Sequence, residues 1–163
     1  MDRAYEFRIY PDRLQRQLIA KTFGCCRLVY NHYLAERKHR YEETKIALSY
    51  TDCAKDLTRL KKEKPFLREV DSIALQQSLR HLDSAFTNFF RQAKAGYPRF
   101  KSRKSGRNSY STVCVNGNIR LGEKTIRLPK LGKVKIRRHR DIPEGWILKS
   151  VTVKQTASGK CFV

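Results

Sequence analysis

The sequence predicts an α+β protein in which a small antiparallel β-barrel, resembling an OB-fold, is interrupted by an α-helical insertion. Residues 4–10 alternate between apolar and polar side chains, as a half-buried strand does. Residues 11–95 carry apolar side chains at helical spacing, and from Gly96 onward the pattern becomes short strands separated by turns. A lone strand is not stable, so we expect the first strand to join the later sheet. The barrel part then comprises residues 1–10 plus 96–163, and the helical part residues 11–95.

The helical part begins directly after the first strand. Pro11 ends that strand and Asp12 favours a helix start, while Gly24 inside the following pattern predicts a bend or a junction of two helices. We expect a second helix from about Thr51, a good N-cap, to Lys64, because Pro65 cannot continue it.

The third helix has the clearest apolar periodicity of the chain. We expect Asp71 or Ser72 to cap its start and Gly96 to close it. Its apolar stripe consists of Leu75, Leu79, Leu82, Phe86, Phe89 and Phe90. Its opposite stripe consists of Arg80, Ser84, Thr87, Arg91 and Lys94, and is interpreted either as a solvated face or as a nucleic-acid contact.

Short strands are predicted at residues 110–115, 118–121, 125–128, 133–138 and 147–156. Asn116-Gly117 is a strong hairpin signal between the first two of them. Several short strands with tight turns favour a small barrel, a shape that often binds oligonucleotides. Residues 160–163 begin a further strand without finishing it, so we expect the natural protein to continue.

The charge of the chain favours a polyanionic partner. Lys and Arg number 36 against 15 acidic residues, a formal net charge of +21. Residues 1–95 hold 19 basic and 12 acidic side chains, whereas residues 96–163 hold 17 basic and only three acidic ones. The second segment is therefore the stronger candidate surface for backbone phosphates. There is no long apolar run and no signal-peptide core, so we expect a cytoplasmic nucleic-acid-binding protein and no membrane partner.

The sequence contains no recognisable catalytic or metal-binding pattern. Five cysteines in irregular positions form neither a disulfide framework nor a Cys-x-x-Cys pair, and we interpret them as buried or half-buried free thiols in a reducing cytoplasm. The acidic residues lie mostly on predicted helices beside basic ones, where exposed ion pairing explains them. We therefore expect no catalytic residue, no metal site and no cofactor in these 163 residues.

Two basic segments are candidates for binding phosphates. The loop after Gly96 holds Arg99, Lys101, Arg103, Lys104 and Arg107 among small and aromatic residues. Long cations reach phosphates and aromatic rings stack on unpaired bases, although a solvated loop is the alternative interpretation. Alternation in the strand at 133–138 places Lys133, Lys135 and Arg137 on one face.

Several motifs in this order resemble TnpB, the OrfB-type protein of bacterial and archaeal insertion sequences. The resemblance spans essentially the whole chain. It rests on Tyr10-Pro11, Gly24, Arg27, Val29-Tyr30-Asn31, Leu34, Leu75-Gln76-Gln77-Ser78-Leu79, Phe89-Phe90, Tyr97-Pro98-Arg99-Phe100-Lys101 and Leu128-Pro129-Lys130-Leu131-Gly132.

The resemblance implies an RNA-guided DNA endonuclease related to the CRISPR type V effectors. Such proteins combine a wedge barrel, a helical recognition insertion often called a helix-turn-helix, and a RuvC-like nuclease with a zinc element. This chain resembles only the wedge and recognition parts, so Mg²⁺ and Zn²⁺ are expected only in the nuclease domain that would follow in the same polypeptide. The implied partners are a guide RNA from the transposon end and target double-stranded DNA, in a nucleoid-associated cytoplasmic protein often described as a transposase.

The resemblance also implies roles for individual residues. Tyr50 and Gln76 occupy positions that read a short DNA motif beside the target, with Ser72 and Arg80 nearby on the same helix. Ala54, Ser72 and Ile73 depart from the family pattern, so the resemblance does not give the sequence of that motif. From the residues alone, Gln76 is equally interpreted as an ordinary exposed helical glutamine.

Two other functions are compatible with the sequence. One is a nuclease-free repressor or remnant of the same family that occupies DNA without cutting it. The other is a plain basic RNA-binding or ribosome-associated protein, whose binding would depend steeply on salt and show no specificity.

Overall fold

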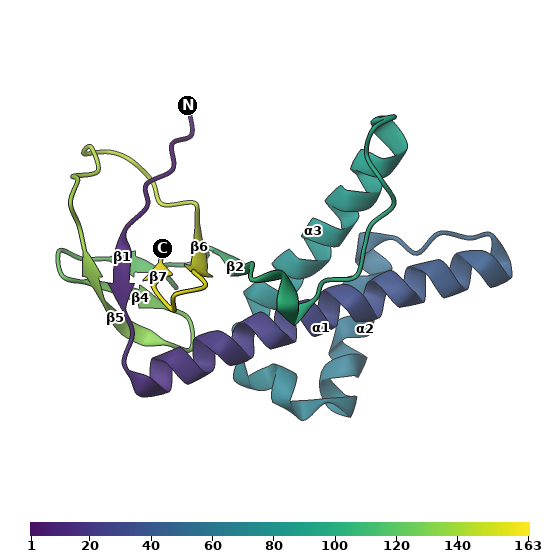
Figure 1. Ribbon diagram of the computed structural model, residues 1–163, viewed down its shortest axis with the longest axis horizontal. Coiled ribbons are helices and arrows are strands. Elements are labelled where there is room, and N and C mark those ends of the chain that lie inside the picture. The colour runs from purple at the N-terminus through teal and green to yellow at the C-terminus, as the bar shows by residue number, and fades with distance from the viewer.

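The structure, a computed structural model, describes residues 1–163 as three long helices and one seven-stranded antiparallel sheet (Figure 1). The helices are α1 (Arg13–Thr44), α2 (Tyr50–Glu63) and α3 (Ser72–Arg91), with short 3-10 turns at Pro65–Glu69 and Arg103–Ser105. The strands are β1 (Arg8–Tyr10), β2 (Asn108–Val113), β3 (Arg120–Leu121), β4 (Thr125–Leu128), β5 (Gly132–Arg137), β6 (Ser150–Gln155) and β7 (Cys161–Phe162). The α+β class with a helical insertion is confirmed.

The strand order in the sheet is β2-β6-β7-β1-β5-β4-β3. Strand β1 therefore lies between β7 and β5, and Ile9 is opposite both Ile136 and Cys161. Phe7 and Val163 exchange two backbone hydrogen bonds, of 2.7 and 2.9 Å, just beyond the ladder. The strand that is expected over residues 4–10 comprises only Arg8–Tyr10, because residues 4–7 extend past the end of β5.

The sheet forms a half-barrel whose end strands, β2 and β3, are not paired with each other. Asn116 and Gly117 do form the turn expected between them, with φ of 52° and 70°. The predicted hairpin pairing is wrong, however, because the side chain of Asn118 takes the place of a partner strand. Its amide oxygen accepts from the Val115 N–H at 2.7 Å and its amide nitrogen donates to the Val113 carbonyl at 3.1 Å.

Helix α1 is continuous over 32 residues, so the bend or junction expected at Gly24 is wrong. The glycine costs about 1 kcal/mol of helix propensity relative to alanine. Its neighbours Phe23, Cys25 and Cys26 are buried in the core, and this burial outweighs that local cost.

Two predicted caps are also wrong. Ser49, rather than Thr51, caps α2 in a reciprocal capping box with Asp52. Helix α3 begins at the expected cap Asp71 but ends at Arg91, well before Gly96. The early end lets the chain turn back, so that Tyr97 packs against the rings of Phe86 and Phe89 at centroid distances of 5.6 and 5.3 Å.

The helices and the sheet share one hydrophobic core of 29 buried residues. The first half of α1 covers the inner face of the sheet, where the rings of Phe23 and Tyr110 lie 5.8 Å apart. The second half extends beyond the sheet and packs against α3 (Figure 1). Four of the five free cysteines are buried and Cys114 is half-buried. No helix is long and apolar enough to cross a membrane.

Candidate nucleic-acid interface

The solvent-facing side of the half-barrel carries basic side chains on five of its seven strands. Residues that are opposite each other in an antiparallel sheet point to the same face, so the strand register defines its members. No strand contains an acidic residue. We call this surface the basic sheet face; its cations are Arg8, Arg120, Arg127, Lys133, Lys135, Arg137 and Lys154.

Three pairs of cations on the basic sheet face are directly opposite each other. Arg8 faces Arg137, Arg127 faces Lys133, and Arg127 also faces Arg120 on its other side. Like charges in directly opposite positions destabilise a sheet. Lys154 pairs with Glu6, but none of the other six cations has a carboxylate partner. A bound polyanion would remove this repulsion.

The predicted residues Lys133, Lys135 and Arg137 are all exposed on this face, as the alternation of β5 predicts. Sequence reasoning missed Arg8 and Arg127 as members of the same surface. The alternation of Arg8 with buried Ile9, and of Arg127 with buried Ile126, was visible in the sequence, but the neighbours of each strand were not.

The basic loop of residues 97–107 is fastened to α1 by a single side chain. The amide of Asn31 donates to the Lys101 carbonyl at 2.9 Å and accepts from the Lys101 N–H at 2.8 Å. It thus pairs with both backbone groups of one residue, as a strand partner would. Buried Pro98 adds a second anchor. The remaining basic side chains of the loop are exposed: Arg99, Arg103, Lys104 and Arg107.

Lys101 differs from the other basic residues of the loop. Its ammonium group lies 4.3 Å from the centroid of the Tyr30 ring, and desolvation of that group by burial lowers the pKa of Lys101. The pKa of His81 on α3 is also lowered, first by burial and then by the charge of Lys101. Lys101 is therefore held to α1 by Asn31 and Tyr30, whereas the other four cations of the loop form no ion pair and remain free to contact a ligand.

Three of the predicted nucleic-acid-binding residues form one stripe on α3. Ser72, Gln76 and Arg80 are exposed and follow one another at four-residue steps. The guanidinium of Arg80 lies 4.6 Å from the ring centroid of half-buried Tyr50, at the start of α2. The two helices thus bring Arg80 and Tyr50 into direct contact. Lys94, expected further along the polar face of α3, lies outside the helix.

The start of this stripe is tied to the sheet. Buried Asp71 accepts from the Ile73 N–H at 2.9 Å and from the hydroxyl of buried Thr112, on β2, at 2.5 Å. One carboxylate therefore caps α3 and fixes its first turn against β2.

The predicted residues form three groups: the α3 stripe with Tyr50, the loop, and β5. Strand β5 lies four places from β2 in the sheet order, and β2 is the strand against which α1 and α3 pack (Figure 1). The basic sheet face and the α3 stripe are therefore separate surfaces over one hydrophobic core. No group of three or more His, Cys, Asp or Glu side chains is placed to hold a metal ion.

Comparison with known proteins identifies the relatives of the chain. Residues 1–45 match a family described as the helix-turn-helix domain of OrfB proteins of the IS605 kind. The chain is 41% identical over 163 residues to a protein of Streptomyces pristinaespiralis named as an RNA-guided DNA endonuclease, which covers 99% of this chain. It is 33% identical over 162 residues to the Escherichia coli K12 protein InsQ, which carries the same description.

The chain belongs to the TnpB/OrfB family. It spans about two fifths of the length of these relatives, 40% of the Streptomyces protein and 39% of InsQ. It is also 37% identical over 117 residues to the virulence protein VsdF of Salmonella dublin, a match that covers 66% of this chain and 98% of VsdF.

The structure of this TnpB-family chain contains no turn inside the segment that matches the helix-turn-helix family. Residues 1–45 form β1 and the single helix α1, which runs without interruption to Thr44. A helix-turn-helix places its second helix in the DNA major groove. In this chain α2 and α3 are joined by the turn at Pro65–Glu69 and pack against each other, and Tyr50 of α2 contacts Arg80 of α3.

Proposed function

We propose that this chain is the nucleic-acid-binding N-terminal part of a transposon-encoded RNA-guided DNA endonuclease. In this proposal residues 1–10 and 96–163 hold the guide RNA, and residues 11–95 read a short motif on the target DNA. Guide pairing would carry most of the sequence information while the protein recognises shape and the short motif. The nuclease chemistry, with its metal ions, would belong to the part of the longer relatives that this chain does not span.

The observation that carries the proposal is the basic sheet face. It sets seven cations on neighbouring strands against one paired acid, Glu6. Such a surface contacts phosphates without reading bases, which suits an RNA scaffold recognised by its shape. The α3 stripe has the opposite character, because Gln76 and Tyr50 offer an amide and a ring suited to base edges.

The binding of RNA is tested by affinity for the structured transposon-end RNA and for a scrambled RNA of equal length, over a range of salt concentrations. We expect the native chain to bind the cognate RNA at least about tenfold more tightly at each salt concentration, and both affinities to fall as salt rises. Equal affinities for the two RNAs throughout would overturn the proposal in favour of an unspecific basic RNA-binding protein.

The reading of DNA is tested with the chain bound to its RNA and a library of duplexes that differ beside the target. We expect Gln76→Ala to reduce discrimination between duplexes by about tenfold while leaving RNA affinity unchanged. Gln17→Ala, at an exposed position on α1, is the matched control. Unchanged discrimination by the Gln76 variant would remove that residue from the motif-reading site.

A nuclease-free DNA- or RNA-binding protein of the same family is the second candidate. It is favoured by the match to VsdF, since that protein is covered over 98% of its length by a chain without a recognisable catalytic site. Sequencing the gene downstream of codon 163 separates the candidates. A continuing frame with widely spaced acidic residues and a Cys-x-x-Cys pair supports the endonuclease, and a stop codon supports the stand-alone binder.

A further inference from the structure

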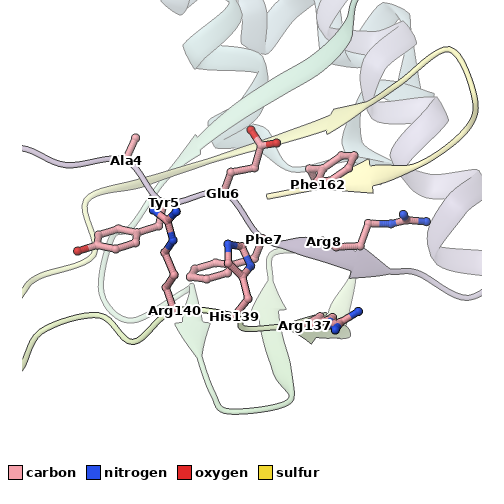
Figure 2. Close-up of a pocket in the computed structure, with 9 residues that line it drawn as sticks. All are labelled: Ala4, Tyr5, Glu6, Phe7, Arg8, Arg137, His139, Arg140 and Phe162. Atoms are coloured by element: carbon pink, nitrogen blue, oxygen red, sulfur yellow. The ribbon is translucent and has the colours of Figure 1, made fainter.

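A pocket of about 590 Å³ opens at the end of the half-barrel, where the chain before β1 passes the residues that follow β5 (Figure 2). Its volume lies within the range of small-molecule sites. Nine residues line it: Ala4, Tyr5, Glu6, Phe7, Arg8, Arg137, His139, Arg140 and Phe162. Of the nucleic-acid-binding residues predicted from the sequence, only Arg137 lines it.

The pocket combines aromatic rings with cations. The ring of His139 meets that of buried Phe7 edge to face at 5.4 Å, and the ring of Tyr5 lies nearly parallel to that of Phe7, at 9°. Figure 2 shows the side chain of Arg140 rising beside Tyr5 and the His139 ring beside Phe7. This side of the pocket presents flat groups on which a planar ring can stack.

The other side of the pocket carries two arginines, Arg8 and Arg137, that have no anionic partner in the protein. Arg8 and Arg137 are directly opposite in the sheet and point the same way, away from Tyr5 (Figure 2). The Arg8 guanidinium lies 5.0 and 5.5 Å from the ring centroids of Tyr10 and Phe162, and its enclosed Nε has no hydrogen-bond acceptor.

Nothing in the protein neutralises these arginines. Arg8, Arg137 and Arg140 form no ion pair, and the only acidic residue of the pocket, Glu6, is already paired with Lys154. Guanidinium groups of this kind bind phosphate oxygens through paired N–H donors.

We propose that this pocket holds one unpaired nucleotide of a single strand. Its phosphate lies between Arg8 and Arg137, and its base stacks on the surface formed by Tyr5, His139 and Arg140. The inference rests on the proposed function, to which it adds a specific site: the basic sheet face binds the phosphates of the scaffold, and the pocket takes a base that has left the helix. RNA and single-stranded DNA share this chemistry, so the test includes both.

The test measures binding of the whole chain to a short oligouridine, about eight nucleotides long, to the matching DNA strand, and to an RNA duplex of the same phosphate count. We expect Tyr5→Leu to weaken binding of the single strand by about fivefold to tenfold, because stacking is lost. The loss should persist at high salt, since stacking is not screened, and duplex affinity should not change. Tyr41→Leu, at an exposed tyrosine on α1, is the control.

Arg140→Gln provides a second variant at an exposed position where folding is not at risk. Photocrosslinking with thiouridine-substituted RNA should attach the strand to pocket residues. Weakening of the RNA strand alone assigns the site to RNA, and weakening of both strands assigns it to single strands of either kind. If both variants bind the single strand as tightly as the native chain does, the inference is overturned.

The two proposals fail separately. If the native chain prefers transposon-end RNA and both pocket variants still bind the single strand normally, the proposed function stands and the pocket inference is wrong. If the native chain shows no preference for that RNA but the Tyr5 variant binds the single strand more weakly, the pocket inference stands and the guide-RNA function is wrong.

Discussion

Asp71 connects helix α3 to the sheet through one buried carboxylate. Its two acceptor bonds join different parts of the molecule, because Ile73 belongs to α3 and Thr112 to β2. The orientation of the α3 stripe relative to the basic sheet face therefore depends on a residue that lies in neither surface.

Replacing Asp71 should cost more than an ordinary helix cap. Asp71→Ala loses the cap, worth about 1 kcal/mol, and leaves the buried Thr112 hydroxyl without an acceptor, at about 1–3 kcal/mol. We expect the free energy of unfolding to fall by about 2–4 kcal/mol in urea titrations. Ser49→Ala, which removes the exposed cap of α2, should cost only about 1 kcal/mol. Equal losses of unfolding free energy in both variants would contradict a role of Asp71 in joining α3 to β2.

Asp56 makes stability depend on pH. Hydrogen bonds from Arg59, and one from the Tyr33 hydroxyl at 2.9 Å, hold the pKa of Asp56 below its ordinary value despite partial burial. A carboxylate with a lowered folded pKa contributes stability that is complete above its unfolded pKa, about 3.9, and is lost as pH falls through the folded value.

We therefore expect the native chain to lose stability as the pH falls below about 4, the unfolded pKa of an aspartate, and Asp56→Asn to show a flatter profile there. Urea unfolding at successive pH values measures both curves. Asp141→Asn, at a fully exposed carboxylate, should follow the native curve. Parallel native and Asp56→Asn curves would show that this carboxylate gives no acid-dependent stability.

At the scale of elements, α1 is one helix that serves both halves of the molecule. Gln15 donates to the carbonyls of Leu131 and Lys133, at 3.2 and 2.7 Å, so the first turn of the helix is fixed beside β5. Asn31, farther along the same helix, holds the basic loop at Lys101. An unbroken helix keeps these two attachments at a fixed separation.

Gly24 tests that continuity. A methyl group at Gly24 would meet only the end of the Arg27 side chain, at 3.8 Å, and the residue is helical. Gly24→Ala should therefore raise the free energy of unfolding by about 0.5–1 kcal/mol. Gly132→Ala is the contrasting variant, because that site has equal space but a φ of +71°, so alanine should destabilise it. A destabilised Gly24 variant would indicate a bend that this structure lacks.

Strand β4 tests the repulsion on the basic sheet face. Arg127 lies between Lys133 and Arg120, so Arg127→Gln removes two directly opposite like-charge pairs at once. We expect the free energy of unfolding at low salt to rise by about 0.2–1 kcal/mol for each pair, while RNA binding weakens and its salt slope falls by about one. Lys38→Gln, at an exposed position on α1, should change neither quantity appreciably. A loss of stability in the Arg127 variant would contradict the repulsion.

At the scale of the whole molecule, sheet and helices unfold together if the shared core is what holds them. Trp146, the only tryptophan, lies next to Arg3 near the sheet, so its fluorescence reports on the sheet part. Far-ultraviolet circular dichroism follows mainly the helices. We expect both signals to change at the same urea concentration, because the 29 buried residues form one cluster. Separate midpoints would show that the helical and sheet parts are independent units.

The sequence predicted those features that depend on local pattern. The strand Thr125–Leu128, the start of α3 and the outward face of β5 follow from periodicity alone. The continuity through Gly24 and the early end of α3 depend on burial and on Tyr97, which distant residues determine. The pairing of Arg8 with Arg137, and hence the pocket, requires the strand order, which no local pattern contains.

The place of β1 in the sheet has a consequence for how the protein is made. Translation delivers Arg8–Tyr10 before either of its neighbours, because β5 begins at Gly132 and β7 at Cys161. At a few to about 20 residues per second, the first strand waits on the order of ten seconds for its partners. All three helices have left the peptidyl-transferase centre by then, so the helical part can assemble while Phe7 and Ile9 are still in water. Strand β1 is thus synthesised well before both of its neighbours and is among the last of these strands to be enclosed.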